Sequence, residues 1–258
     1  MKSLLKISGM THRFGGLAAV SNLNIELPQG AIYGLIGPNG SGKTTTFNLI
    51  TGIYRPSEGS IRLDGREIAG MKPYRIVRLG IARTFQNLRI FENLSVLDNI
   101  RIALNGSAHS GIIPSVLRTP SFKREEKAIR DKAYELLKGM KLEYRADQMA
   151  KNLPYGEQRR LEIARAIATE PKLLLLDEPA AGMNPKEVEE LMALIIDARK
   201  AFGLTILLIE HHMKFVMGIC ENITVLNFGE TIACGRPEEV ASDARVLEAY
   251  LGRRGAQC

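Results

Sequence analysis

The chain has 258 residues, and its 35 Lys and Arg against 28 Asp and Glu give a formal net charge of +7 with histidine neutral. Its 45% hydrophobic and 24% charged residues are typical of a globular protein and exclude the fibrous and disordered classes. No uncharged apolar run approaches the ~18 residues of a membrane-spanning helix, and the basic residues are dispersed, so charge alone selects no partner.

The first 30 residues alternate between apolar and polar side chains, with turn signals at Gly15-Gly16 and at residues 28–30. This pattern predicts short strands of a mixed or antiparallel sheet. An apolar strand over 31–36, a glycine-rich loop and a helix over 44–51 are expected next, and Gly52 ends that helix. The sequence therefore predicts a strand–loop–helix unit after the first sheet.

Residues 105–120 are rich in Gly, Ser and Pro and are expected to form a loop or insertion. Thr119 and Pro120 suit the cap and the first position of a following helix. Apolar residues then recur at helical spacing: Ile129, Ala133, Leu136, Leu137 and Met140.

Two later runs, 173–176 and 205–209, are apolar enough to be strands buried on both faces. Between them Asn184, Pro185 and Glu187 make a good helix start, because Glu187 can reach back to the cap. Apolar strands that alternate with amphipathic helices predict an α/β fold around a mostly parallel sheet.

The three cysteines, Cys220, Cys234 and Cys258, are widely separated and form no CxxC motif or Cys/His cluster. The sequence therefore supports neither a disulfide framework nor a zinc site, and reduced thiols are expected.

Residues 37–44 fit the phosphate-loop pattern GxxxxGK[ST]. Glycines let successive backbone N–H groups converge on phosphate oxygens, and the N-terminus of the following helix adds positive potential. Lys43 can neutralise phosphate charge, and the Thr44 hydroxyl can ligate Mg²⁺. The alternative is a glycine-rich turn with an incidental lysine. The predicted nucleotide-binding residues are Gly37, Pro38, Asn39, Gly40, Ser41, Gly42, Lys43, Thr44 and Thr45.

The strand at 173–176 ends in Asp177-Glu178. A carboxylate there can hold Mg²⁺ through water, and a second carboxylate beside it can polarise an attacking water molecule. The alternative for an acidic pair after a strand is a solvated strand end. Its position after a phosphate loop favours the catalytic interpretation.

An ordered set of short motifs over nearly the whole chain resembles the ATP-binding cassette (ABC) ATPases. These motifs are HRFGG, the phosphate loop, RTFQN, LPYGEQRRLEIARA, LLLLDEP and LLIEHHM. The resemblance implies the cofactors ATP and Mg²⁺, a P-loop NTPase fold with an N-terminal antiparallel β subdomain, and a helical subdomain that carries the signature segment.

The same resemblance implies a role for individual residues. Phe14 would stack on adenine, with a core phenylalanine as the alternative, and Gln86 would reach Mg²⁺ and the attacking water. Glu178 would be the catalytic base, and Asp177 would join Thr44 and Gln86 at the metal. His211 would contact the γ-phosphate and is favoured over His212, because the family places its histidine directly after the Ile-Glu pair.

Residues 1–258 are expected to form a single ABC ATPase domain with three parts. The nucleotide-binding core would comprise about 1–86 and 168–235, and the helical subdomain about 87–167 with the insertion 105–120. A C-terminal helical extension would occupy about 236–258.

The signature segment departs from the family pattern LSGGQ. It reads Leu153-Pro154-Tyr155-Gly156-Glu157, so proline replaces the serine that donates to the γ-phosphate of the opposite subunit. Gly156 remains, and a helix is expected to begin after it. Asn184 likewise stands where many relatives have aspartate. These changes weaken the contacts made to the opposite subunit and leave the chain's own half-site complete.

The signature segment, the stretch GIARTFQNLRIFENLSVLDNI and the ending GRPEEVASDARVLEAYLG resemble the LivG-type ATP-binding subunits of bacterial branched-chain amino-acid importers. The resemblance implies ATP hydrolysis on the cytoplasmic face of the inner membrane, in a peripheral subunit held by integral permease subunits. A related second ATPase is favoured over a homodimer, and a substrate-binding protein is an indirect partner. The alternatives are a lipopolysaccharide or lipid exporter ATPase and a soluble ABC ATPase acting on nucleic acid or ribosomes. In the favoured importer interpretation, no nucleic-acid partner is expected.

The segment 87–91 is expected to receive a short cytoplasmic helix of the permease, since the family places coupling there. The alternative is that Ile90 and Phe91 belong to the core of the helical subdomain.

Overall fold

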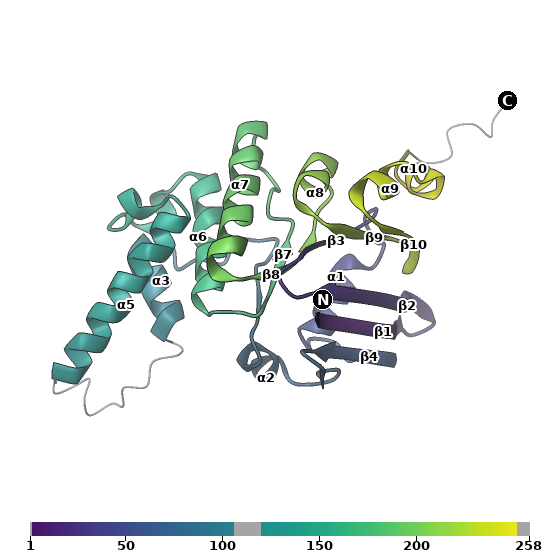
Figure 1. Ribbon diagram of the computed structural model, residues 1–258, viewed down its shortest axis with the longest axis horizontal. Helices are drawn as coiled ribbons and strands as arrows, with labels where there is room; N and C mark the ends of the chain where they lie inside the picture. Colours follow the sequence, from purple (N-terminus) through teal and green to yellow (C-terminus); the bar gives the residue numbers. More distant parts are fainter. Residues whose placement is uncertain (1, 106–119, 252–258) are drawn as a thin grey trace. The chain divides into compact units, whose positions relative to one another are not determined.

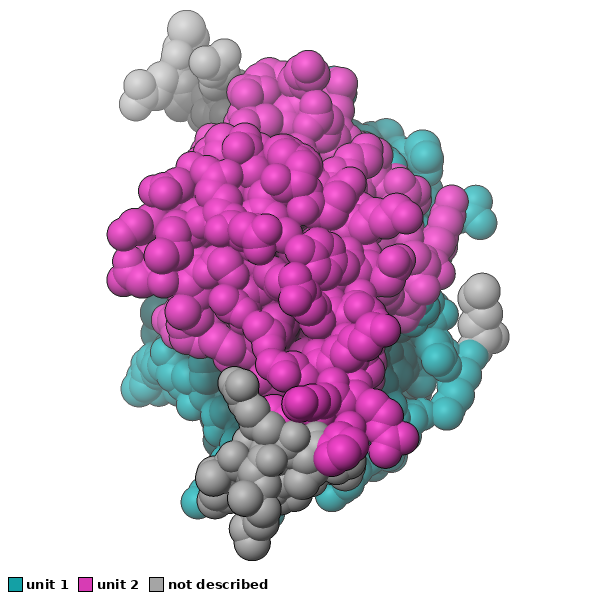
Figure 2. Space-filling model, turned by 90° about the vertical axis from the view of Figure 1, so that its left-hand side faces the viewer, with its two compact units in different colours: residues 1–83, 172–181, 203–258 teal, residues 84–171, 182–202 magenta. Residues whose placement is uncertain are grey.

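The computed structural model describes residues 2–105 and 120–251, which divide into two compact units (Figure 2). Unit 1 comprises residues 1–83, 172–181 and 203–258, and unit 2 comprises 84–171 and 182–202. The predicted insertion lies outside the described residues over 106–119, and so does Thr119, the expected helix cap.

A four-stranded antiparallel sheet opens unit 1, with strand order β2-β1-β4-β5 (Figure 1). Its strands are β1 (Ser3–Phe14), β2 (Leu17–Pro28), β4 (Glu58–Leu63) and β5 (Arg66–Glu67). The predicted turn at Gly15-Gly16 joins β1 to β2, because Gly15 takes the left-handed φ of 59° and Phe14 pairs with Leu17. The sequence correctly predicted an antiparallel sheet, but two long strands replace the expected short ones.

The second sheet of unit 1 has the order β10-β9-β3-β8-β7-β6. It contains β3 (Ile32–Ile36), β6 (Ile81–Arg83), β7 (Leu173–Asp177), β8 (Thr205–Ile209), β9 (Asn222–Asn227) and β10 (Glu230–Gly235). All neighbours are parallel except β9 and β10, so the mostly parallel sheet is confirmed. Every residue of β3, β7 and β8 is buried, as their continuous apolar sequences predict.

The helices of unit 1 are mostly short: α1 (Lys43–Ile50), α2 (Pro73–Arg78), α8 (Met213–Ile219), α9 (Pro237–Ala241) and α10 (Ala244–Leu251). The core of the unit joins apolar side chains from both sheets to those of α1, including Leu5, Ile25, Leu35, Phe47 and Leu207. This packing fixes β3 and α1 on either side of residues 37–42, the loop that the sequence singled out.

Unit 2 is helical. It contains α3 (Val96–Asn105), α5 (Pro120–Gly139), α6 (Tyr155–Ala168), α7 (Pro185–Phe202) and the 3₁₀ turns η1 (Glu143–Arg145) and η2 (Ala150–Asn152). Ala133, Leu136, Leu137 and Met140 are buried, as the helical spacing predicted, and Ile129 is half-buried.

Helix α7 begins with the predicted reciprocal cap. Asn184 Oδ1 accepts hydrogen bonds from the backbone N–H groups of Lys186 and Glu187, each at 3.0 Å, and Glu187 Oε2 accepts from Asn184 N at 2.9 Å. The expected subdomain boundaries differ from the observed units mainly in this helix. The sequence assigned 168–235 to the core, whereas α7 belongs to unit 2 because it packs on α5 and α6.

Each helix within residues 2–105 and 120–251 is too short or too polar to span a lipid bilayer.

Candidate functional site: a phosphate loop and the strand ends beside it

The phosphate loop follows β3 and requires glycine at two tightly packed positions. Gly37 has φ of 148°, and a Cβ there would lie 2.1 Å from the carbonyl oxygen of Leu226. Gly42 has φ of 105°, and a Cβ there would lie 2.4 Å from the carbonyl oxygen of Ala19. Any larger residue would therefore displace backbone from β9 or β2.

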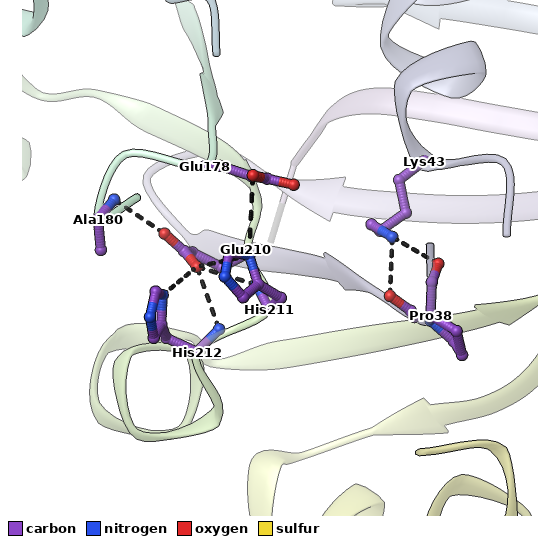
Figure 3. A network of polar contacts seen from close by, with 8 residues as sticks. Pro38, Lys43, Glu178, Ala180, Glu210, His211 and His212 are labelled. Atoms are coloured by element: carbon purple, nitrogen blue, oxygen red, sulfur yellow. Dashed lines mark hydrogen bonds and ion pairs between the residues drawn. The ribbon is translucent and has the colours of Figure 1, made fainter. Parts of the chain in front are cut away.

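Lys43, the first residue of α1, folds back over this loop (Figure 3). Its ammonium donates to the carbonyl oxygens of Gly37 at 2.7 Å and Pro38 at 2.8 Å. Burial lowers the pKa of Lys43, and the negative charges of Glu178 and Asp177 oppose that shift. The side chain is thus a buried cation facing two carboxylates.

Ser41 supplies an independent sign that the loop receives an anion. Its Oγ is buried and has no hydrogen-bond partner in the structure. A buried hydroxyl without a partner is costly, and an incoming phosphate oxygen would satisfy it. The left-handed glycines, the buried Lys43 and the orphaned Ser41 hydroxyl together fit a polyphosphate, and they argue against an incidental glycine-rich turn.

Asp177 ends β7 beside the loop, as the sequence predicted. Its carboxylate is almost fully buried and forms an ion pair with Arg83, Nη2 to Oδ2, at 2.7 Å. Arg83 ends β6, and its Nη1 donates to Asn48 Oδ1 on α1 at 2.7 Å. Asp177 is therefore held in place from two elements and is not a solvated strand end.

Glu178 directly follows, with its backbone in the left-handed region at φ of 48°. Such a conformation costs a non-glycine residue roughly 1–3 kcal/mol and persists only where the surroundings impose it. Here the Glu178 N–H donates to the carbonyl oxygen of Ile209 on β8 at 2.9 Å. The strained backbone holds the carboxylate next to His211, whose Nδ1 lies 3.8 Å from Glu178 Oε2 (Figure 3).

Strand register explains why these distant segments meet. Ile209 pairs with Leu35 of β3 on one side and with Asp177 of β7 on the other, so the three carboxyl ends lie at one edge of the sheet. In parallel sheets this edge is where ligands bind. The structure thus brings together the phosphate loop, Asp177-Glu178 and His211.

Phe14 is 47% exposed at the end of β1, so the core alternative for this residue is wrong. Its ring makes edge contacts with His12 and Tyr54, at centroid distances of 4.6 and 5.3 Å. An aromatic side chain exposed to this extent is compatible with stacking on a base.

In unit 2, the signature segment lies at the start of α6. Pro154 is the N-cap, and the helix begins at Tyr155, one residue before Gly156 and slightly earlier than expected. Glu157 is tied to Arg145, Nε to Oε2, at 3.0 Å. Gln86 is exposed three residues beyond β6 and also belongs to unit 2.

The sequence interpretation missed a buried ion pair behind Gln86. Arg159 is fully buried; its Nη1 lies 2.6 Å from Glu162 Oε2 and donates to the carbonyl oxygen of Phe85 at 2.7 Å. Glu162 Oε1 accepts from the N–H groups of Phe85 and Arg89 at 3.4 and 3.3 Å. The loop that carries Gln86 is therefore anchored on α6 at both ends.

Phe91 is 43% exposed, with the guanidinium carbon of Arg165 4.5 Å from its ring centroid. Ile90 is half-buried. The alternative that placed Phe91 in the core is therefore wrong, and its ring is an accessible feature of unit 2.

Fold and site together define a P-loop ATP-binding cassette. Residues 20–181 match the ABC transporter family, and residues 230–256 match the family described as branched-chain amino acid ATP-binding cassette transporter. The chain is 47% identical to the high-affinity branched-chain amino acid transport ATP-binding protein LivG of Escherichia coli, over 96% of this chain and 98% of that protein.

The lipopolysaccharide export system ATP-binding protein LptB of Haemophilus influenzae is 34% identical over 98% of both chains. Among solved structures, MJ1267, an ATP-binding cassette of an ABC transporter, matches with a TM-score of 0.84 at 31% identity, covering 98% of this chain and all of that one. The chain belongs to the ABC transporter family, in the group of transport ATP-binding proteins that includes LivG. It is an ATP-binding, ATP-hydrolysing transport ATPase.

Proposed function

We propose that this chain powers the import of branched-chain or other hydrophobic amino acids through integral permease subunits, on the cytoplasmic side of the inner membrane. The match of residues 230–256 to the branched-chain amino acid cassette family carries this proposal. Those residues follow all of the shared cassette motifs in the sequence. The higher identity to LivG than to LptB favours import over the exporter alternative.

Binding of ATP would use the residues of unit 1. Phe14 would stack on adenine, and the residues from Gly37 to Thr45 would wrap the phosphates. Lys43 would leave the Gly37 and Pro38 carbonyl oxygens to reach the β- and γ-phosphates, and Ser41 would gain the partner that it lacks.

Mg²⁺ prefers oxygen ligands, and the Thr44 hydroxyl with the Asp177 carboxylate supplies two such donors beside the loop. Gln86 would contribute a third oxygen. When bound, the ion would neutralise phosphate charge.

Hydrolysis would use Glu178 as the general base, because its carboxylate follows Asp177 at the same sheet edge and its backbone is fixed by Ile209. His211 would contact the γ-phosphate.

The signature segment supports pairing with a different ATPase. Pro154 offers neither a hydroxyl nor an N–H where the family serine offers both. A hydrogen bond to a charged phosphate is worth roughly 1.5–3 kcal/mol, or about a tenfold to hundredfold change in rate. A homodimer would carry that loss at both sites, whereas a partner with an intact signature would complete the site built on Glu178.

Purification of the chain from its native membrane tests the proposed assembly. We expect integral permease subunits and a second, related ATPase to co-purify, and the reconstituted complex to import branched-chain amino acids with ATP. Two copies of this chain without a second ATPase would disprove the heterodimer. A complex that moves lipid and no amino acid would restore the exporter alternative.

The exposed Phe91 yields a separate prediction about coupling. Truncating a central interface aromatic costs about 2 kcal/mol, so Phe91→Ala should lower transport by roughly tenfold or more while the isolated subunit keeps its ATPase activity. The matched control is Ile102→Ala on α3, which is 42% exposed and should leave both activities unchanged. An equal fall in transport and ATPase activity, with a lower melting temperature, would mean that Phe91 acts through stability.

A further inference from the structure

Three consecutive residues after β8 bring together two imidazoles and a carboxylate: Glu210, His211 and His212 (Figure 3). Glu210 Oε2 lies 3.1 Å from His212 Nδ1 and 3.8 Å from His211 Nδ1. One ligand atom from each residue lies within 4.8 Å of the other two. All three residues belong to unit 1.

These separations suit a tetrahedral transition-metal ion. Zn²⁺ binds imidazole nitrogen and carboxylate oxygen at ~2.1 Å, which places tetrahedral ligand atoms ~3.4 Å apart. The two measured separations lie on either side of that value. An ion bound by Glu210 and either imidazole would therefore need shifts of only a few tenths of an ångström.

The Glu210 carboxylate is already fixed in the orientation that such a site needs. It is fully buried, and its Oε1 accepts from the N–H of Ala180 at 2.8 Å. Its Oε2 accepts from the backbone N–H groups of His211 at 2.9 Å and His212 at 3.1 Å. These bonds hold a metal ligand in place, as hydrogen bonds behind a ligand do in known metal sites.

An ion would reach the buried Glu210 carboxylate past the two histidines, which are partly exposed to solvent. Their side chains are 47% and 42% exposed, and their ring centroids lie 4.3 Å apart. An ion would lie between His212 Nδ1 and Glu210 Oε2, which now contact each other directly. With the ring proton of His212 on Nε2, Nδ1 can bind the ion while the backbone bonds to Glu210 stay in place.

We propose that Glu210, His211 and His212 bind a divalent transition-metal ion of the Zn²⁺ class, separately from the magnesium that accompanies ATP. Imidazole nitrogen selects Zn²⁺, Cu²⁺ or Ni²⁺ over Mg²⁺, which prefers oxygen ligands. The ligands are adjacent residues and include no cysteine, so the absence of a Cys/His motif in the sequence did not reveal this cluster.

Occupation of the site would affect catalysis, a consequence that rests on the proposed role of His211. The ion would hold the imidazole that should contact the γ-phosphate. It would also place positive charge beside Glu178, whose Oε2 is 3.8 Å from His211 Nδ1. Bound Zn²⁺ is therefore an inhibitor of hydrolysis.

Direct binding of Zn²⁺ to the untagged, nucleotide-free chain tests the site. Competition with a chromophoric chelator should show one site in a Cys234→Ser/Cys258→Ser background, which removes thiol ligands. His211→Gln and His212→Gln should each weaken the affinity by roughly 10- to 100-fold. His12→Gln, which removes a histidine elsewhere in unit 1, should leave the affinity unchanged. Equal Zn²⁺ affinity in all of these proteins would overturn the proposal.

Folding and function are checked separately. His212→Gln should keep the parent melting temperature without metal. It should lose the rise in melting temperature that Zn²⁺ gives the parent, and an unchanged rise would contradict the site.

With free Zn²⁺ fixed by a metal buffer, the parent ATPase should be inhibited, and the ATPase of His212→Gln should be resistant to Zn²⁺. Binding without inhibition would confirm the metal site and disprove its effect on His211. Absence of binding would remove the site and leave the ATPase function untouched.

Discussion

Glu178→Gln should abolish most ATP hydrolysis while leaving ATP binding intact. The amide keeps the size of the carboxylate but cannot accept a proton, and general-base catalysis is typically worth about a hundredfold or more. The backbone is not expected to move, because the Glu178 N–H bond to Ile209 and the left-handed φ are properties of the main chain. Steady-state ATPase assays and equilibrium nucleotide binding measure the two effects.

Glu230→Gln on β10 is the matched control, since it makes the same change at an exposed position of unit 1. In the assembled transporter, Glu178→Gln should also trap a long-lived ATP-bound dimer. Wild-type turnover in that complex would exclude Glu178 as the base.

Pro154 in the signature segment predicts that the two ATP sites of a heterodimer hydrolyse ATP at different rates. If a partner ATPase supplies the intact signature, the site containing Glu178 should be the faster one. Glu178→Gln should then reduce turnover more than the equivalent change in the partner. The reverse order, with Glu178→Gln tolerated, would show that the asymmetry runs the other way.

Lys43→Ala should reduce both ATP affinity and hydrolysis. Hydrogen bonds from a charged donor are worth roughly 1.5–3 kcal/mol, so the loss of the ammonium should weaken ATP binding by about tenfold to a hundredfold. The ammonium is already buried against the loop, where it donates to the carbonyl oxygens of Gly37 and Pro38. Isothermal titration with ATP measures the change.

Two variants separate this binding effect from a loss of folding. Lys6→Ala removes an exposed lysine from β1 and should leave ATP affinity unchanged. Lys43→Met keeps most of the buried stem and should show the same loss of affinity at a melting temperature near that of the wild type. Retained ATP affinity in both Lys43 variants would contradict the phosphate-loop role.

Much of unit 1 could be predicted from local sequence. The phosphate loop is a run of consecutive residues whose glycines have a conformational reason, and the structure places Gly37 and Gly42 in the left-handed conformations that the motif implies. The buried strands β7 and β8 follow directly from uninterrupted apolar runs. The cap of α7 could also be predicted, because Asn184 and Glu187 are three residues apart.

Other features depend on which strands become neighbours. The Arg83–Asp177 ion pair joins residues 94 positions apart and forms because β6 pairs with β7. Nothing in the sequence around either residue indicates that the two form an ion pair. The Glu210 bond to Ala180 has the same origin, since β7 and β8 end side by side.

The family, the α/β fold and the chemistry of the phosphate loop could all be predicted from the sequence, because they depend on contiguous motifs. Exposure and ion pairing depend instead on contacts between segments far apart in the chain. The fold was therefore needed to show which aromatic residues are exposed, that α7 belongs to unit 2, and that Asp177 pairs with Arg83 and Glu162 with Arg159. Phe14 and Phe91 could each have been core residues by composition, and their exposure of 47% and 43% is fixed by the fold.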